Sequence, residues 1–423
     1  MKGDGISHQI SPQDNGRSFH RLPDSCVSSL VGEAVMLLKL FYLYGAGCGL
    51  MPALLRKRKF LRQRGYLVYT ACLHGVLLVL LPFTFPQYMY DGSYMSGNLV
   101  LQWAFNLTNI TRIFVMISGG FLTWSKRKKL LEMAERTFQH CQKCKKLGDD
   151  SSLRKRFRGL LVQYLFVLNL SVLVATLILC RIDTDQSFSN ATMIVVHILQ
   201  FSYVVIMTAS LFVILVILHW QNERVQLALR DLSRSLHHEE RNSLVLSGGK
   251  ARKSLSNLRN LFQLYSENQR LIREAFSIFD LPIALILLKM FVTNVNLVYH
   301  GVQFGNASIE TSSYTRFVGQ LVVITHYWSA VLLMNVVDDL TRRSGPKMGD
   351  ILREFSDLEL VKREFHLQLE LFSDHLRCHP AIYKVCGLFV FNKQTSLVYF
   401  FYVLVQVLVL VQFDLKNKVI EKH

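Results

Sequence analysis

The sequence predicts an all-α membrane protein with seven transmembrane helices, a cytoplasmic N-terminus and an extracellular C-terminus. Three observations support this fold class. The 423 residues are 51% hydrophobic and only 18% charged, whereas soluble domains carry about 25% charged residues. Several apolar runs reach the roughly 20 residues that a helix needs to cross a bilayer. The basic residues, which give a formal net charge of +18, lie in blocks between those runs, as in cytoplasmic loops.

Seven runs are long and apolar enough to be predicted as transmembrane helices. An eighth, at 34–55, contains Lys39 and ends in GAGCGLMP. Its glycines and Pro52 disfavour a straight helix, so we expect a re-entrant or interfacial element before the first span. The seven predicted spans are residues 66–86, 99–123, 160–180, 191–219, 281–302, 317–337 and 395–413.

The loops between the spans predict the orientation. Residues 56–65 contain six basic and no acidic residues, and the loops at 125–159 and 221–280 are also basic, which places all three in the cytoplasm. Sequons at Asn190 and Asn306 fall in or beside outer connections, so both asparagines are predicted to be glycosylated. The outer connections, nearly free of Lys and Arg, are 87–98, 181–190 and 303–316.

Composition and motifs argue against nucleic-acid binding, metal binding and catalysis. The basic residues form no face interleaved with stacking aromatics, so nucleic acid is not an expected partner. Cys141 and Cys144 form a CxxC in a lysine-rich loop without a second such pair, which favours two reduced cytosolic thiols over a metal or redox site. No nucleophile–base set or phosphate loop occurs. We therefore expect no enzyme, no cofactor and no metal.

The C-terminal segment carries a family resemblance. Gly387, Leu388 and Phe389 are followed by Asn392, and a last apolar span closes with Gln412-Phe413 after the run VLVLV. This pattern resembles that of the insect gustatory receptors, which are related to the insect odorant receptors. The family's Thr-Tyr pair within the last span is replaced here by Val405-Gln406, although the spacing is retained.

The resemblance implies a tetrameric, ligand-gated, non-selective cation channel in the plasma membrane of sensory neurons. It also implies a small-molecule tastant as ligand, and a homotetramer or a heterotetramer with other receptor subunits. A G-protein-coupled type of receptor and a transporter are the alternative functions. The expected domains are a cytoplasmic tail (1–33), a re-entrant element with a basic segment (34–65), a six-helix ligand-binding bundle (66–337), a cytoplasmic anchor (338–394), a pore-lining helix (395–413) and an extracellular tail (414–423).

The last span is the candidate pore helix. Val398, Phe401, Val405, Leu408 and Gln412 share one face of a helix, and an apolar pore can gate by losing water. A lipid-facing or packed helix is the other interpretation. A ring of carboxylates after the constriction would favour cations. The predicted pore and gate residues are Val405, Leu408, Val409, Gln412, Phe413 and Asp414.

Polar and aromatic residues in the outer halves of spans two to six are candidates for the ligand pocket, since such pockets combine aromatic walls with a few polar anchors. Helix–helix packing is the alternative role for each residue. The mixture leans to aromatic and apolar groups, which favours a bitter or aversive tastant. Arg112 and Lys289 are charged within spans and either face a water-filled cavity or reach water by snorkelling. The pocket candidates are Trp103, Asn106, His197, Gln200, Tyr203, Asn294, Asn296, Tyr299, Gln320, His326, Tyr327 and Trp328.

Overall fold

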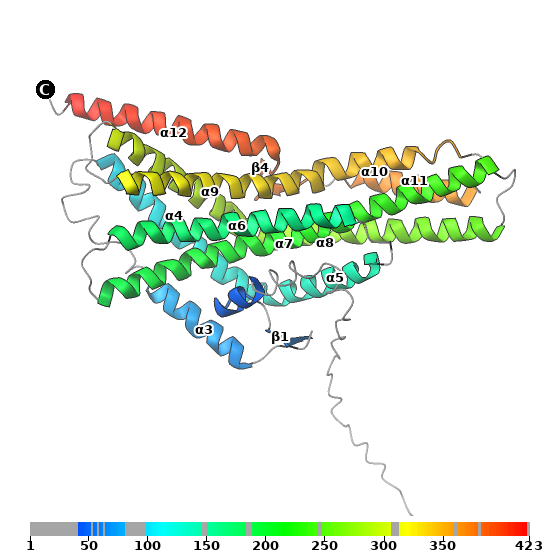
Figure 1. Cartoon of the computed structure of the whole chain (residues 1–423), viewed down its shortest axis with the longest axis horizontal. Helices are drawn as coiled ribbons and strands as arrows, with labels where there is room; N and C mark the ends of the chain where they lie inside the picture. The colour runs from blue at the N-terminus through cyan, green and yellow to red at the C-terminus, as the bar shows by residue number, and fades with distance from the viewer. Residues whose placement is uncertain are drawn as a thin grey trace, which may run out of the picture.

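The molecule is an elongated bundle of helices that mostly follow one long axis (Figure 1). The structure is a computed structural model. It describes residues 41–51, 54–56, 59–61, 64–80, 99–145, 147, 151–182, 188–242, 248–305, 313–358, 363–379 and 382–420.

The helices follow the predicted spans closely in the C-terminal two thirds of the chain. They are α3 (Arg64–Val79), α4 (Leu99–Ser125), α5 (Arg127–Lys145), α6 (Ser151–Ile182), α7 (Phe188–Asn242), α8 (Gly248–Gly305), α9 (Ser313–Asp338), the π-helix η3 (Asp339–Arg343), α10 (Ser344–Arg353), α11 (Arg363–Cys378) and α12 (Lys393–Ile420).

Five helical stretches are long and apolar enough to cross a membrane within the described residues. They lie in α6, α7, α8, α9–α10 and α12. They contain the last three predicted spans completely and all but about three residues of the predicted spans 160–180 and 191–219. The first two predicted spans, in α3 and α4, do not meet this length and hydropathy criterion. Helix α3 has 16 residues, and residues 81–86 of the first predicted span lie outside the described residues. Helix α4 has 27 residues but includes polar side chains such as Asn109 and Arg112, which lower its hydropathy.

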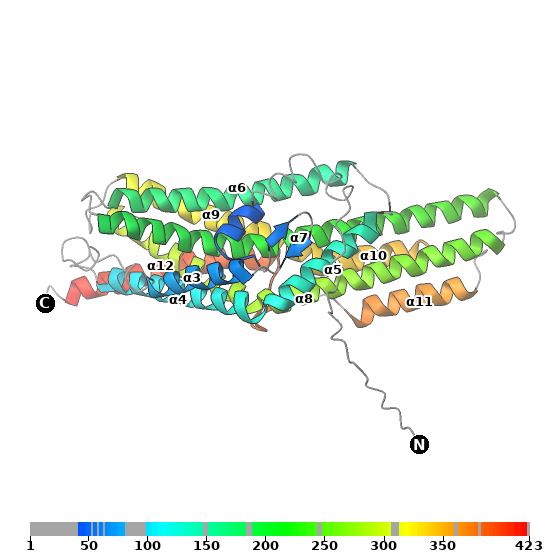
Figure 2. The same cartoon turned by 90° about the horizontal axis from the view of Figure 1, so that it is seen from below.

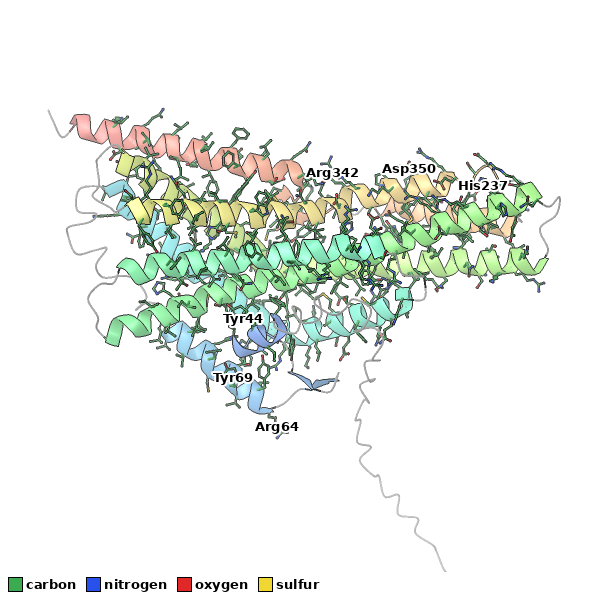
Figure 3. The ribbon with its side chains drawn as sticks, in the orientation of Figure 1. Tyr44, Arg64, Tyr69, His237, Arg342 and Asp350 are labelled. Atoms are coloured by element: carbon green, nitrogen blue, oxygen red, sulfur yellow. The ribbon has the colours of Figure 1, made fainter. Side chains whose placement is uncertain are left out.

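Helices α7 and α8 continue far beyond the length of a membrane span. With 55 and 58 residues, they are each about 80–90 Å long, against a hydrocarbon core of about 30 Å. Helices α5, α10 and α11 pack beside their extensions (Figure 2). We call this part of the molecule the distal bundle. His237, Arg342 and Asp350 lie on it in Figure 3.

The distal bundle has its own apolar core. Phe355, Phe365 and Phe372 are fully or almost fully buried there, packed with residues of α7 and α8. Ion pairs link neighbouring helices around this core, including Arg136 of α5 with Glu274 of α8 at 3.1 Å and Lys347 of α10 with Glu223 of α7 at 3.4 Å. Helix α7 therefore continues past the fourth predicted span, 191–219, into the distal bundle as far as Asn242.

Two short hairpins were not expected from the sequence. Strands β1 (Leu54–Arg56) and β2 (Lys59–Leu61) pair within the predicted basic segment, and β3 (Lys384–Val385) pairs with β4 (Phe389–Val390). Before the first hairpin, the described part of the predicted re-entrant element is a helical turn at 41–47 that packs on α3. There the Tyr66 hydroxyl donates to the Ala46 carbonyl at 3.2 Å.

Candidate functional site

Five polar side chains from four helices are buried together inside the bundle. Arg112 (α4), His197 (α7), Lys289 and Asn294 (α8) and His326 (α9) are each at most 9% exposed. Each lies about 14–24 Å along its helix from the helix end that adjoins one of the connections 87–98, 181–190 and 303–316, at about 1.5 Å per residue. We call this group the central polar cluster.

Direct contacts hold the first half of the cluster. Arg112 Nη1 lies 2.9 Å from His197 Nε2. Because a guanidinium can only donate, His197 Nε2 accepts and the imidazole is neutral. Lys289 Nζ lies 4.9 Å from the centre of the Phe201 ring, a cation–π distance, and interacts electrostatically with both Arg112 and His326. Both cations are therefore buried inside the helix bundle.

The second half of the cluster reaches the last helix. His326 Nδ1 lies 3.1 Å from Asn294 Oδ1, and Asn294 Nδ2 donates to the Tyr399 hydroxyl of α12 at 3.5 Å. Tyr399 also packs edge-on against Phe291, with ring centres 5.8 Å apart. The interior polar groups therefore touch the candidate pore helix directly.

The structure brings only part of the predicted pocket set together. His197, Asn294 and His326 belong to the cluster, and Gln200 lies one turn from His197 on the same face of α7. Trp103, Gln320 and Trp328 point outward and are exposed. These three side chains therefore lie outside the central polar cluster. The two tryptophan rings suit a lipid-facing surface.

The remaining predicted pocket residues neither belong to the central polar cluster nor are exposed. Tyr203 packs against α4, where an added Cβ at Gly119 would collide with its ring. Asn296 donates to Thr108 at 3.4 Å, and Tyr327 packs on Phe400 of α12. Tyr299 is fully buried in an apolar cluster, and Asn106 is half-buried.

Helix α12 is the least covered of the long apolar helices. Only 17% of its apolar stretch is buried, compared with 44–72% in the other four. Val405 and Leu408 are 50% and 62% exposed, and Phe413 is 58% exposed. Val409 and Gln412 are also exposed. Five of the six predicted pore residues thus lie on one uncovered side of α12.

Asp414 is the exception among the predicted pore residues. It is 7% exposed, and its Oδ2 accepts a hydrogen bond from Gln303 Nε2 of α8 at 3.1 Å. The helix also continues to Ile420, so Asp414 does not end the helix as expected. Because Asp414 shares the inward face with Val403 and Val407, the predicted ring of carboxylates facing a pore is not what this chain presents.

A groove of about 420 Å³ runs beside the uncovered side of α12. Its walls come from α4, α8 and α12 and are almost wholly apolar. Trp103 and Phe413 both line it. The groove connects one predicted pocket residue with one predicted gate residue, on the outside of the bundle rather than inside it.

Comparison with known proteins identifies the family. Residues 38–417 match the family model described as 7tm Chemosensory receptor. The chain belongs to that family. It is 68% identical over 395 residues to "Putative gustatory receptor 58a" of Drosophila melanogaster, covering 92% of this chain and 100% of that protein. It is 29% identical over 378 residues to "Putative gustatory receptor 58b" of the same species, covering 85% and 87%.

The fold is also that of a solved insect receptor. The structure of the olfactory receptor OR5 from Machilis hrabei in complex with eugenol matches with a TM-score of 0.62 at 12% identity, over 90% of this chain and 100% of that one. Another structure of the same receptor matches equally well, at 13% identity. The predicted resemblance to gustatory receptors is confirmed, and the chain is a multi-pass membrane receptor rather than an enzyme.

The family motif Gly387-Leu388-Phe389 forms the turn into β4. Gly387 has φ of +72°, a conformation that glycine adopts without strain. Asp280 Oδ1 anchors the hairpin by accepting from the Tyr383 hydroxyl at 3.0 Å and the Cys386 amide at 2.7 Å. Asn392 then caps α12, its Oδ1 accepting from the Thr395 amide at 2.9 Å. The motif therefore fixes where the last helix begins.

The CxxC lies in the distal bundle on α5. Cys144 is fully buried, and burial raises the pKa of its thiol to about 12. Burial also lowers the pKa of the neighbouring His140 to about 4. Among the described residues no group of three or more metal-binding side chains occurs. Asn306 and the side chain of Asn190, the predicted glycosylation sites, lie outside the described residues.

Proposed function

We propose that this receptor is a subunit of a ligand-gated, non-selective cation channel that opens when a small-molecule tastant, most simply an aversive one, binds at the central polar cluster. The uncovered side of α12 carries this proposal. An apolar helix with few partners in its own chain needs lipid, another subunit or a pore to cover it. Its polar members, Gln406 and Gln412, suit water better than lipid.

The contact between the cluster and α12 supports a gating mechanism. A ligand that moves Asn294 or His326 changes the hydrogen bond to Tyr399, and with it the position of α12. Val405, Leu408, Val409, Gln412 and Phe413 would then line or close the pore. In the solved complex, the Machilis receptor, whose fold this chain shares, holds eugenol, a small molecule.

We propose that the receptor assembles into a homotetramer or a heterotetramer with other receptor subunits, which would cover the exposed side of α12. Residues 66–337 would form the ligand-binding bundle and 338–394 the anchor between subunits. On α11, Leu367 and Leu371 are 57% and 52% exposed, whereas Phe365 and Phe372 are buried within the chain. We therefore assign the inter-subunit contacts of the anchor to Leu367 and Leu371.

The receptor would lie in the plasma membrane of sensory neurons, with a cytoplasmic N-terminus and the end of α12 outside. An epitope tag at the C-terminus should be accessible on intact cells, and a tag at the N-terminus should not. The reverse staining pattern would reject this topology, and with it a pore whose outer mouth lies at Phe413.

The channel itself is tested by recording current from cells that express the chain alone or with other receptor subunits. We expect tastant-evoked cation current that persists when G-protein signalling is blocked from the pipette. Phe413→Ala should raise the basal current because it removes the largest exposed side chain of the constriction. Leu404→Ala, on the same helix but outside the predicted gate, is the matched control. Responses that vanish on G-protein block would favour a G-protein-coupled receptor instead.

A further inference from the structure

A groove on the surface of α6 combines basic and apolar side chains. It has a volume of about 540 Å³, and all of its lining residues come from this one helix, which runs along the upper edge of the bundle in Figure 2. The opposite face of α6 packs into the core of the bundle through buried residues such as Phe157, Leu161 and Tyr164. The groove therefore faces away from the rest of the chain. Its lining residues are Lys155, Arg158, Gly159, Val162, Gln163 and Phe166.

The basic side chains lie at one end of the groove. Lys155 and Arg158 are both exposed, and they lie in the second turn of α6. The helix contains no acidic residue between Ser151 and Ile182. This end of the groove therefore suits a group with negative charge.

The other end of the groove is apolar. Val162 and Phe166 are 41% and 64% exposed, and exposed apolar residues continue along α6 at Leu173 and Leu177. The distance along the helix from Lys155 to Phe166 is about 17 Å. This length is close to half of the hydrocarbon core of a bilayer, which is about 30 Å thick. The groove therefore extends from the depth of the lipid head groups toward the middle of the membrane.

We propose that this groove binds a phospholipid with an anionic head group. The phosphate pairs with Lys155 and Arg158, since both side chains form charge-assisted hydrogen bonds with phosphate oxygens. One acyl chain lies over Gly159 and packs against Val162 and Phe166. The absence of a side chain at Gly159 opens the middle of the groove, because a Cβ added there would meet no atom within 4 Å.

The proposed orientation of the receptor favours this class of lipid. Residues 125–159 are predicted to be cytoplasmic, so the basic end of the groove lies at the cytoplasmic leaflet, where anionic phospholipids give the surface its negative potential. A zwitterionic lipid supplies no net charge to the basic end, and a soluble anion leaves the apolar end uncovered. The site is separate from the central polar cluster, so it goes beyond the proposed function and its test needs no recording of current.

The test uses the purified full-length receptor in a mild detergent, and the shift of the thermal unfolding midpoint during a titration measures binding. Dioleoylphosphatidylserine is compared with dioleoylphosphatidylcholine, which has the same tails and no net charge, and with glycerophosphoserine, which has the head group and no tails. We expect phosphatidylserine to raise the midpoint at concentrations at which the other two compounds do not. No effect of phosphatidylserine, or an equal effect of either of the other compounds, would overturn the proposal.

Substitutions of the basic residues locate the head group. Lys155→Gln and Arg158→Gln should each weaken phosphatidylserine binding about fivefold, which is the contribution expected of one basic residue beside anionic lipid. Arg156→Gln is the matched control. Arg156 is exposed in the same turn, but its guanidinium carbon lies 5.9 Å from the centre of the Phe157 ring, and it does not line the groove. It should leave the affinity unchanged, and an equal loss in Arg156→Gln would show a diffuse attraction to basic residues and reject the site.

Filling the groove tests its apolar part. In Gly159→Leu the new side chain enters open space, so the helix stays intact and the affinity for phosphatidylserine should fall at least as far as in Lys155→Gln. Gly120→Leu on α4, where an added Cβ also meets no atom within 4 Å, is the matched control and should leave the affinity unchanged. Unchanged affinity in Gly159→Leu would contradict the proposal. If this variant also loses tetramers on native gels, a neighbouring subunit and not a lipid covers the groove.

Discussion

The hydrogen bond between Asn294 and Tyr399 joins the central polar cluster to the proposed pore helix. Tyr399→Phe removes the hydroxyl that accepts from Asn294 Nδ2 at 3.5 Å. The ring remains, so the edge-on contact with Phe291 is kept. The substitution therefore tests the polar link alone.

The size of the effect follows from the geometry. A donor–acceptor distance of 3.5 Å is at the long end for a hydrogen bond, and hydrogen bonds between membrane helices contribute about 0.6 kcal/mol on average. That free energy corresponds to about a threefold change in an equilibrium constant. If ligand binding acts on α12 through this bond, its loss reduces the coupling, and the ligand concentration for half-maximal current should rise about threefold.

The assay is a dose–response series in cells that express equal surface amounts of each variant. Tyr402→Phe is the matched control, because Tyr402 is one turn away on α12 and 58% exposed; it should leave the dose–response curve unchanged. Identical curves for Tyr399→Phe and the parent receptor would refute the coupling route. A shift in Tyr402→Phe of the same size would show that any lost hydroxyl on α12 has this effect.

Three further predictions concern the ends of the molecule. Asp414→Asn should leave cation conductance unchanged, because the carboxylate faces α8; a clear fall in single-channel conductance would return Asp414 to the pore. Phe372→Ala should destabilise the distal bundle by about 3–5 kcal/mol. Leu371→Asp should leave the unfolding midpoint of the monomer unchanged but disrupt tetramers on native gels. Intact tetramers in Leu371→Asp would contradict the proposed inter-subunit role of the anchor. At pH 7–8 a thiol reagent should label the exposed Cys378 and leave Cys144 unlabelled until the protein is denatured. Burial raises the pKa of Cys144 to about 12, and the reactive thiolate forms only as the pH approaches that value. Rapid labelling of Cys144 in the native protein would show that α5 opens.

Hydropathy and charge patterns predicted the long helices well. The runs from 160 onward are dominated by Leu, Val, Ile and Phe, so a helix is the structure that satisfies their backbone in lipid. The hairpins at 54–61 and 384–390 could not be predicted in this way, since strands of two or three residues leave no periodic pattern. The extension of α12 past Phe413 was missed for another reason. Its polar residue Asp414 is satisfied by Gln303, a contact between distant parts of the chain.

The sequence indicated which residue types the candidate site contains, but not which of these residues contact one another. His197, Asn294 and His326 are polar residues within apolar runs, which marks them in the sequence. Their partners, Arg112 and Tyr399, are on other helices, and the rotation of each helix decides which side chains meet. The same rotation turns Trp103 and Trp328 outward. A single sequence does not determine it, because aromatic residues suit lipid and pocket equally.

The pore assignment of α12 is tested most directly by cysteine substitution along that helix. Leu408 is 62% exposed and Val407, beside it, is 5% exposed. We predict that a charged thiol reagent applied from outside blocks the evoked current of Leu408→Cys and of Val405→Cys, and does not block that of Val407→Cys or of the parent receptor. Block at Val407→Cys but not at Leu408→Cys, or at neither position, would contradict a pore lined by the uncovered side of α12.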